Sequence, residues 1–319
     1  MKAERAAGRN GNASDDLLVK VAWWYHFDGL TQDQIAERLG TSRPSVSRMI
    51  ERAKAQGITR VHIAPAYLSR LDICTKVRDK FGLREVVLLP PAPEGEDSAA
   101  SLRSRLGIAG MHTLVSALEN SHTLAIGWGE TVAEIMSQLP GDELSHLDVV
   151  SLTGGVNVYA NAIHQNRSIG ESSMRIDLIP TPLFVSSEKL ALALQGEESV
   201  SRTLSTARRA DVALISVGAP SAEASLWRMG GATPEELDEV LSLGGVGDVL
   251  GVFYDAAGEP LELERNRRRI GVDISALRDI GTVIGVAGGA EKHETIRGAL
   301  KGHYIDVLVT DMETLEFLA

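Results

Sequence analysis

The chain has 319 residues, a formal net charge of −11 and one cysteine. This length suits a small domain joined to a larger one, and the net negative charge argues against a protein that coats nucleic acid over its whole surface. The lone Cys74 excludes an internal disulfide. The sequence lacks the run of about 20 apolar residues that a bilayer span requires, so a cytoplasmic location is expected.

Charge is distributed unevenly along the chain. Residues 1–70 contain 11 Lys and Arg against 7 Asp and Glu, a net +4, which leaves −15 for residues 71–319. A basic end on an acidic chain is typical of a protein that contacts nucleic acid with one domain, because phosphate attraction is needed only at the contact surface. Residues 1–14 lack a hydrophobic signal core and are predicted to be disordered.

Residues 31–50 have the spacing of a helix-turn-helix. Thr31 and Gln34 match a capping box at the start of a short helix, and Gly40 is suited to ending it. A preceding helix over residues 16–27 completes a three-helix head, and a short strand over residues 58–63 closes the predicted domain, residues 15–65. The second helix of the motif would be capped by Ser42, and its inward apolar face would consist of Val46, Met49, Ile50 and Ala53.

The outward face of that second helix is polar and cationic, with Arg43, Ser45, Ser47, Arg48 and Arg52. A major groove admits one helix, whose first turns meet base edges while cationic and hydroxyl side chains meet phosphate. A surface hairpin with solvated arginines is the alternative, but the cap, the turn glycine and the polar face coincide in register and favour DNA binding. The DNA contacts predicted from the motif are Thr31, Ser42, Arg43, Ser45, Ser47 and Arg48.

The larger domain, residues 66–319, is predicted to be a doubly wound, mostly parallel α/β fold. A helix over residues 68–81 leads into it, and from Glu85 onward short apolar runs alternate with helical patterns. Several runs are almost entirely apolar, as expected of strands covered by helices on both faces. Residues 90–98 read as a loop. The expected strands are residues 86–89, 123–127, 148–152, 175–180, 211–218, 247–253, 282–288 and 306–310.

Glycines stand where these strands are expected to stop, and ligands of open α/β sheets lie above the carboxyl ends of the strands. For any single pair of glycines a tight strand-to-helix turn is the better explanation, but together the glycines favour a small ligand that carries phosphate. Backbone N–H groups at a helix start attract anions, and Lys292 adds a positive charge there. The candidates on this argument are Thr153, Gly154, Gly155, Gly247, Gly288, Gly289 and Lys292.

Two acidic residues could also face this ligand. Asp248 lies in an apolar run, where an ionised carboxylate is costly unless it faces a crevice, and it could accept hydrogen bonds from sugar hydroxyls. Asp311, with Thr310 before it, is either a ligand residue or a helix cap. The run of residues 265–269, RNRRR, is interpreted as a solvated or subunit-facing surface.

Motifs of other function classes are missing from the sequence. The eight histidines form no HExxH pair and a single cysteine cannot build a thiolate site, so no metal is expected. No GxSxG, GxxxxGK[ST] or GxGxxG element follows a strand, which leaves hydrolase, nucleotidase and dehydrogenase interpretations unsupported and predicts no cofactor. A phosphosugar isomerase or deaminase with an accessory head remains the alternative, with Asp248, Glu291 or Asp311 as its base.

Six segments together resemble the SorC family of sugar-responsive bacterial transcriptional regulators. They are VAWWYHFDGLTQDQIAERLG, LAIGWGET, LTGGV, GVGDVLGVFYDAAG, IGVAGGAEK and VTDMET, and the resemblance spans nearly the whole chain. It implies a ligand-controlled repressor, usually a tetramer, whose larger domain is similar to the phosphosugar isomerase fold but performs no chemistry. Within the family, the chain is most similar to the branch that responds to phosphorylated autoinducer 2, a quorum-sensing signal.

The resemblance also implies roles for individual residues. Asp248 and Lys292 match positions that hold the effector, and the loops at Thr153 and Gly288 match its phosphate-side surroundings. Tyr25 and Gln32 match positions of the head that engage DNA. The expected partners are therefore operator DNA, a phosphorylated effector and further copies of the chain.

Overall fold

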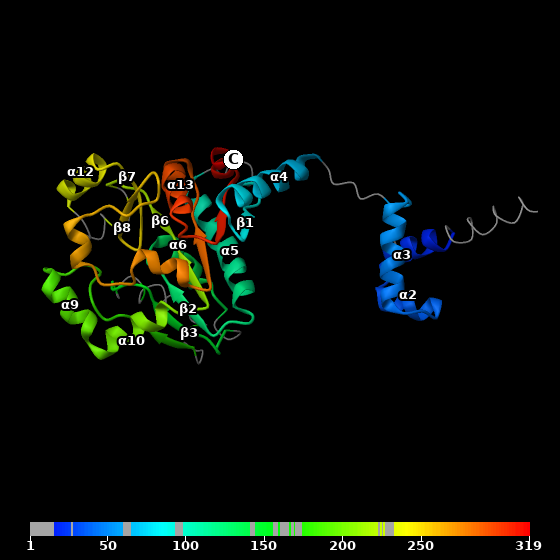
Figure 1. The fold of residues 1–319 in the computed structure, drawn as a ribbon, viewed down its shortest axis with the longest axis horizontal. Helices are drawn as coiled ribbons and strands as arrows, with labels where there is room; N and C mark the ends of the chain where they lie inside the picture. Colours follow the sequence, from blue (N-terminus) through cyan, green and yellow to red (C-terminus); the bar gives the residue numbers. More distant parts are fainter. Residues whose placement is uncertain are drawn as a thin grey trace, which may run out of the picture. The chain divides into compact units, whose positions relative to one another are not determined.

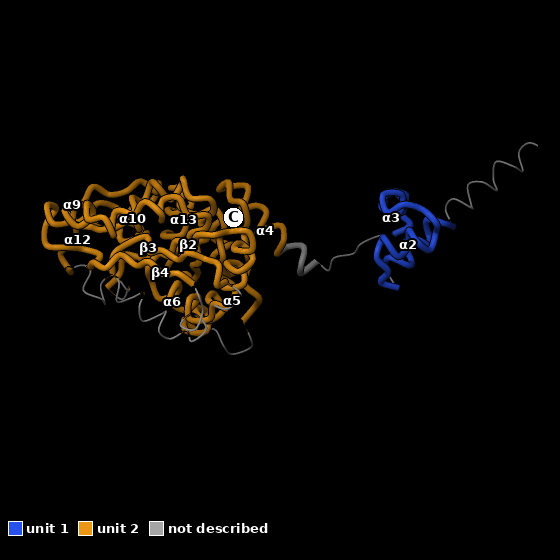
Figure 2. Tube along the Cα trace, turned by 90° about the horizontal axis from the view of Figure 1, so that it is seen from below, with its two compact units in different colours: residues 1–68 blue, residues 69–319 orange. Residues whose placement is uncertain are grey.

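The computed structural model describes residues 16–26, 28–59, 65–92, 98–140, 144–155, 159, 166, 169, 174–222, 224, 226 and 233–319. The chain separates into two compact units, residues 1–68 and 69–319 (Figure 2). The predicted disorder of residues 1–14 lies outside the described residues. None of the described helices is long and apolar enough to cross a membrane.

The first unit contains three described helices: residues 16–26, α2 (Gln32–Leu39) and α3 (Arg43–Ala55). The predicted capping box is present, because the Thr31 hydroxyl accepts from the Gln34 N–H and the Gln34 side chain accepts from the Thr31 N–H. Gly40 ends α2 with φ of 61°, a left-handed conformation that suits glycine. The predicted inward face of α3 is also correct, with Val46 and Ala53 fully buried.

Three predictions for this unit need correction or lie outside the description. Ser42 precedes α3, but its side chain makes no cap hydrogen bond and instead shares one of 3.0 Å with the Ser45 hydroxyl. Ile58 and Thr59 form a bend rather than the start of a strand, because their N–H groups donate back to the carbonyl of Ala53. The rest of that strand, residues 60–63, and the predicted end of the first helix at Phe27 lie outside the described residues.

The second unit confirms the predicted α/β class. The boundary between the units falls within α4 (Pro65–Phe81), which starts three residues before the predicted helix because proline is compatible with a first helical turn. Seven strands form one parallel sheet in the order β1-β10-β9-β5-β2-β3-β4 (Figure 1). They are β1 (Glu85–Leu88), β2 (Thr123–Ile126), β3 (Asp148–Ser151), β4 (Arg175–Asp177), β5 (Val212–Ile215), β9 (Thr282–Val286) and β10 (Val307–Thr310).

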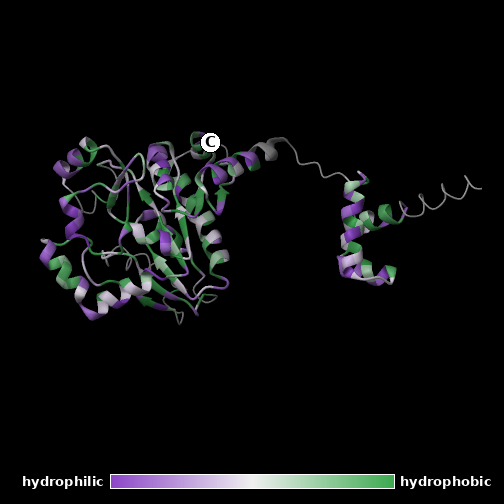
Figure 3. Cartoon of the chain, viewed as in Figure 1, coloured by the Kyte–Doolittle hydropathy of each residue, from purple (hydrophilic) through white to green (hydrophobic). Residues whose placement is uncertain are grey.

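Helices cover both faces of this sheet, and alternate residues of each strand point to opposite faces. Leu124 and Ile126 of β2 pack with α5 (Ala99–Leu118) and α6 (Glu130–Ser137), whereas Ala125 packs on the other side. Figure 3 shows the strands as the most consistently hydrophobic ribbons of this unit. The second face is covered by α4, α10 (Glu198–Ala207), α13 (His293–Lys301) and α14 (Met312–Leu318).

Two predicted strands depart from the parallel sheet. Residues 211–218 were expected to form one strand, but they divide into β5 of the parallel sheet and β6 (Val217–Gly218) of a separate three-stranded sheet. Residues 247–253 were also expected to form one strand, but they contain the turn of an antiparallel hairpin, β7 (Gly245–Val249) and β8 (Val252–Asp255), and β6 pairs with β7. Leu250 and Gly251 form the two-residue turn with φ of 54° and 79°, as in the hairpin turns that match strand twist. α12 (Pro234–Ser242) packs beside this small sheet, whereas α9 (Glu188–Gly196), earlier in the chain, packs with α10.

Candidate functional site

A cavity of about 1140 Å³ opens at the carboxyl ends of five adjacent strands of the parallel sheet. Its wall includes Leu89 after β1, Trp128 after β2, Ser216 after β5, Gly288 after β9 and Asp311 after β10. The small sheet contributes a further side of the cavity through Gly218, Asp248 and Leu250. The site therefore lies where ligands of open α/β sheets bind.

The order of the strands explains this position. From β2 the chain proceeds through β3 and β4 to one edge of the sheet, and from β5 it proceeds through β9 and β10 toward the other. The direction reverses between β2 and β5, and the connections diverge there and leave a crevice. Gly129 at this point has φ of 135°, and a Cβ on it would lie 2.6 Å from the Ser216 hydroxyl. Glycine suits this position, because other residues rarely adopt such a φ.

Asp248 lies in the wall of this cavity and is only 5% exposed. Burial raises the pKa of its carboxyl group to about 6, against the opposing effects of the Gly251 N–H and of the positive charges of Arg265 and Lys292. The Gly251 N–H donates to Oδ2 at 3.1 Å. The second oxygen, Oδ1, is so close to Gly218 that a Cβ there would approach it to 2.2 Å.

Lys292 lies in the same cavity wall, in the short 3₁₀ helix η3 (Ala290–Lys292) that precedes α13. Burial lowers the pKa of its ammonium group, while the carboxylates of Glu291 and Asp248 oppose that shift and the charge of Arg103 adds to it. A half-buried cation and a buried carboxylate thus line one cavity, an arrangement that is costly in a folded protein and frequent at functional sites.

The turn at Gly288 and Gly289 differs from its prediction in one respect. Both glycines line the cavity, but the N–H of Gly289 donates to Asp311 Oδ2 at 2.8 Å and is not free for an anion. The start of η3 follows directly, where a helix leaves N–H groups without partners of its own. Any phosphate at this turn would therefore meet the residues after Gly289 rather than Gly289 itself.

Asp311 both caps a helix and lines the cavity. Its Oδ1 accepts from the Thr314 N–H at 2.9 Å, which caps α14, and its Oδ2 accepts from Gly289 and from the Thr314 hydroxyl. These hydrogen bonds occupy both oxygens, so the capping alternative is correct and a ligand role would compete with it. Thr310 is fully buried and does not line the cavity.

The structure places four other predicted effector residues away from the cavity. The Thr153 hydroxyl lies 2.8 Å from the Tyr159 hydroxyl, while the N–H groups of Gly154 and Gly155 donate to the carbonyls of Ile270 and Thr181. Gly247 packs against the rings and methyls of Tyr254 and Thr295. The physical reason for the first three is strand order, since β3 lies beyond β2, outside the five strands whose ends line the cavity, and the residues after β3 pack on neighbouring segments of the chain.

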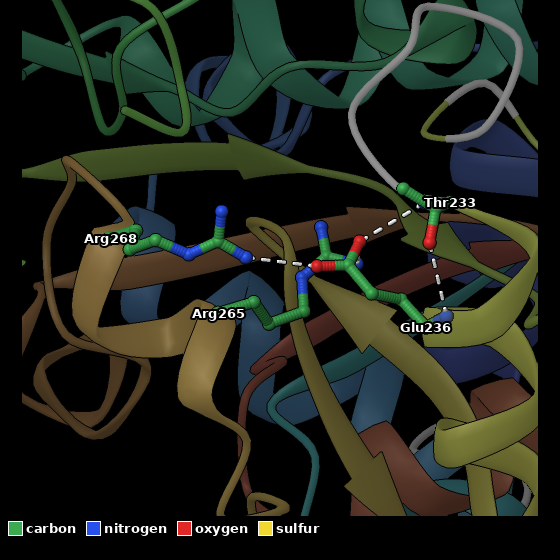
Figure 4. Close-up of polar contacts among 4 residues, drawn as sticks. All are labelled: Thr233, Glu236, Arg265 and Arg268. Atoms are coloured by element: carbon green, nitrogen blue, oxygen red, sulfur yellow. Dashed lines mark hydrogen bonds and ion pairs between the residues drawn. The ribbon is translucent and has the colours of Figure 1, made fainter. Parts of the chain in front are cut away.

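The RNRRR run is not the solvated surface that its composition suggested. Arg265 is 3% exposed, stacks over the ring of Phe184 at 4.3 Å and lies 3.5 Å from Glu236. Glu236 also pairs with Arg268 at 3.0 Å, and its backbone N–H donates to the Thr233 hydroxyl (Figure 4). Arg269 is buried too, which lowers the pKa of its guanidinium to about 10. Only Arg267 of the four arginines is largely exposed, at 68%.

Sequence reasoning missed several residues of the cavity wall, and most of them gave no distinctive signal. Arg103 and Arg105 lie on α5, where they resemble ordinary surface arginines. Glu130 and Thr131 at the start of α6 could have been found, because they belong to the quoted segment LAIGWGET and stand where a strand meets a helix. Other residues missed are Arg70, Trp128, Ser216 and Leu250.

In the helical unit, the predicted DNA contacts share the exposed surface of α2 and α3. Arg43, Arg48 and Thr31 are exposed, while Ser45, Ser47 and Gln32 are half-buried. Arg48 donates to the Ser45 hydroxyl at 3.4 Å, and Arg43 lies 4.0 Å from Asp33, both of them largely solvated. Tyr25, 37% exposed, packs edge-on against His26. The arginines of α3 are therefore available to a partner.

Residues 66–318 match the family described as "Putative sugar-binding domain", and residues 23–56 match "Sigma-70, region 4". A helix-turn-helix head and a sugar-binding α/β domain define a transcriptional regulator that binds DNA and a small ligand.

Among the described residues, no three His, Cys, Asp or Glu side chains gather as they would around a metal ion.

Sequence similarity to named proteins shows which family of regulators the chain belongs to. The chain is 36% identical over 315 residues to "Transcriptional regulator LsrR" of Escherichia coli, covering 98% of this chain and 96% of that protein. It is also 36% identical over 304 residues to the protein of the same name from Enterobacter sp., covering 94% of this chain and 91% of the relative. The chain belongs to the SorC family of transcriptional regulators, as its sequence segments predicted.

Solved structures agree with this assignment. The full-length sorbitol operon regulator SorC from Klebsiella pneumoniae is similar with a TM-score of 0.67 and 27% identity, covering 95% of this chain and 98% of that one. A DeoR family transcriptional regulator from Listeria monocytogenes shares the fold, with a TM-score of 0.70, 23% identity and coverage of 78% of this chain and 99% of that one.

Proposed function

We propose that this regulator is a repressor that leaves its operator when a phosphorylated, sugar-like effector enters the cavity of the α/β unit. The observation that carries the proposal is that Lys292 and Asp248 line one cavity at the ends of five strands. An ammonium group beside a helix start favours phosphate, and a carboxylate accepts hydrogen bonds from hydroxyls. The site thus fits a ligand with an anionic end and a hydroxylated end.

Phosphorylated autoinducer 2 is the effector that we propose first, in a quorum-sensing circuit. The support for it is the resemblance of the six long segments to the branch of the family that responds to this compound. The carboxylate of Asp248 and the ammonium of Lys292 suit the hydroxyls and the phosphate of this compound, but they also suit a pentose phosphate. Sugar phosphates therefore belong in the same experiment.

Calorimetry with phosphorylated autoinducer 2, its unphosphorylated form and several pentose phosphates tests the proposal. Lys292→Ala should weaken binding of the phosphorylated compound, and Asp248→Ala should do likewise, while both proteins keep their operator affinity and no longer release DNA. Lys301→Ala is the matched control, because it removes the same charge from the far end of α13, outside the cavity. Equal binding of both forms of autoinducer 2, with no effect of Lys292→Ala, would rule out the anion site.

Release of the operator by the effector also predicts a measurable relation between the two binding affinities. An effector dissociates the complex only if it binds the DNA-free conformation more tightly, and coupling between two binding sites is reciprocal. Saturating operator DNA should therefore weaken effector binding by the same factor by which saturating effector weakens operator binding. Tighter effector binding on DNA would instead identify a co-repressor or an activator.

A phosphosugar isomerase or deaminase is the second candidate, because a carboxyl group with a pKa of about 6 has the property that a general base needs. Against it, the relatives named above are transcriptional regulators. We propose that the protein is not an enzyme and acts in the cytoplasm. Conversion of any phosphosugar, abolished by Asp248→Asn, would reverse that conclusion.

The DNA side of the proposal places α3 in a major groove, with Arg43, Ser47 and Arg48 toward the operator and Tyr25 and Gln32 beside them. One such head buries little surface and offers few phosphate contacts. We therefore propose that the protein binds a roughly palindromic operator as a symmetric homo-oligomer, a tetramer by analogy with its family.

A further inference from the structure

The cavity wall contains four cationic side chains, and their contacts divide them into two kinds. Arg70 donates to the carbonyl of Leu89 at 2.9 Å, and Arg105 donates to the carbonyl of Pro90. These two arginines thus hold the backbone that follows β1. Arg103 instead forms an ion pair of 2.9 Å with Glu130, and its side chain is half-exposed. Lys292 makes no side-chain hydrogen bond or close ion pair within the described residues.

Arg103 and Lys292 lie close enough for the charge of one to lower the pKa of the other. Two like charges on one wall repel each other, and that repulsion is relieved when an anion lies between them. Glu130 partly serves this purpose in the structure, because its carboxylate binds the Arg103 guanidinium from the first turn of α6. A carboxylate and a phosphate make the same bidentate contacts to arginine.

The start of α6 adds a third attraction for an anion at the same place. This helix has eight residues, and Gly129 at its N-cap has no side chain that could cap it. Gly129, Glu130 and Thr131 all line the cavity. The first N–H groups of a helix attract negative charge, so the helix start and the Arg103 guanidinium favour an anion on the same side of the cavity.

We propose that Arg103 is a positioning residue for the anionic group of the effector and that Glu130 occupies its guanidinium until the effector displaces it. The inference rests on the proposed phosphorylated effector and assigns to that ligand a residue outside the predicted set. Glu130 then competes with every anionic ligand for Arg103 and lowers the affinity of that ligand. Sugars with little negative charge do not displace Glu130, so they leave the Arg103–Glu130 pair intact.

Calorimetric titration with phosphorylated autoinducer 2, and with ribose 5-phosphate as a second probe, tests this role. Arg103→Gln should weaken binding about tenfold, the size expected for one charge-assisted hydrogen bond. Glu130→Gln should strengthen binding about threefold, because the competing charge is gone while the side chain keeps its shape. In the Arg103→Gln background, Glu130→Gln should have no such effect, since there is then no guanidinium to release.

Arg105→Gln is the matched control, because it removes the same charge from the same helix and cavity but from a side chain that binds a backbone carbonyl. It should change affinity less than twofold, on the order expected of a partly screened charge. Melting temperatures without ligand show whether each variant folds. Variants of Arg103 and Arg105 with equal effects, or a Glu130→Gln effect that persists without Arg103, would overturn the inference while leaving the phosphorylated effector standing. If the parent protein binds neither probe, both the effector class and the inference fail.

Discussion

Replacing Asp248 by Asn should stabilise the folded protein at neutral and alkaline pH. The carboxyl group has a pKa of about 6 in the structure against 3.8 as the ordinary value, because burial disfavours its charged form. At 1.36 kcal/mol per pH unit, a difference of about two units makes ionised Asp248 cost at most about 3 kcal/mol of unfolding free energy. Asn keeps the shape of the side chain and its ability to accept from the Gly251 N–H, without the charge.

The sign of the pH dependence follows from which state holds the proton more tightly. The folded pKa is raised, so the folded state binds the proton more tightly and the advantage of the protonated carboxyl is fully present below about pH 3.8. That advantage is lost as pH rises through about 6. The unfolding free energy of the parent protein should therefore fall relative to that of Asp248→Asn between these pH values, and the gap should be largest above pH 7.

Urea unfolding followed by circular dichroism, at fixed ionic strength from pH 4.5 to 8, measures this gap. Asp238→Asn serves as the control, because Asp238 is an exposed carboxylate on α12 and its loss should give no comparable pH-dependent gain. The reasoning would be refuted by an Asp248→Asn protein that is less stable than the parent at pH 8, or by an Asp238→Asn protein with the same pH profile.

Four further outcomes are expected. Thr31→Ala should cost about 1 kcal/mol of head stability by removing the capping box, measured as faster amide exchange in α2. Arg48→Ala should weaken operator binding by ~1–3 kcal/mol in gel-shift titration at fixed salt if it reads a base edge, and Lys54→Ala near the end of α3 should weaken it less. Sedimentation should show an oligomer, and a fully competent monomer would contradict the symmetric binding mode. Glu236→Ala should destabilise the α/β unit by roughly 3 kcal/mol, since buried Arg265 and half-buried Arg268 lose a carboxylate partner, and unchanged urea unfolding would contradict that.

The head was predictable because its signals are local. A capping box needs only residues three apart, and Thr31 and Gln34 form it as predicted. Ser42 shows the limit of such reasoning, because the residue precedes its helix as expected but its hydroxyl pairs with Ser45. A serine near a helix start can choose between a backbone N–H and a neighbouring side chain, and the letters of the sequence do not distinguish the two.

The parallel strands were found from their apolar runs, whereas the hairpin of β7 and β8 was missed. Its turn contains Leu250, which is only 3% exposed and adopts φ of 54°. A buried leucine makes the apolar run continue through the turn, and positive φ is unusual for such a residue. Hairpins are recognised from polar turn residues and glycine, so a sequence with one glycine and a leucine at this point reads as a single strand.

Only some of the residues that line the cavity could be predicted, because the sequence does not show the order of the strands in the sheet. A glycine after a strand shows where that strand ends but not which strand lies beside it. Gly154 and Gly288 therefore looked equivalent in the sequence, although β9 borders the cavity and β3 does not. Arg103 and Glu130 come from different helices, and only the packing of α5 on α6 makes them neighbours. Contacts of this kind depend on tertiary structure and have no local signal.

The charges of the cavity favour a ligand role over a structural one. Asp248 and Lys292 both have pKa values shifted toward their neutral forms by burial, so each costs stability that an apolar side chain of similar size would not cost. Elsewhere in the unit, buried Arg265 has Glu236 and the ring of Phe184 against it. Asp248 and Lys292 face open cavity instead, and a ligand that supplies hydroxyls to one and an anion to the other would offset their cost upon binding. Under the proposed function, offsetting this cost would contribute to effector binding, and it would shift the regulator away from DNA only by as much as the effector binds the DNA-free conformation more tightly.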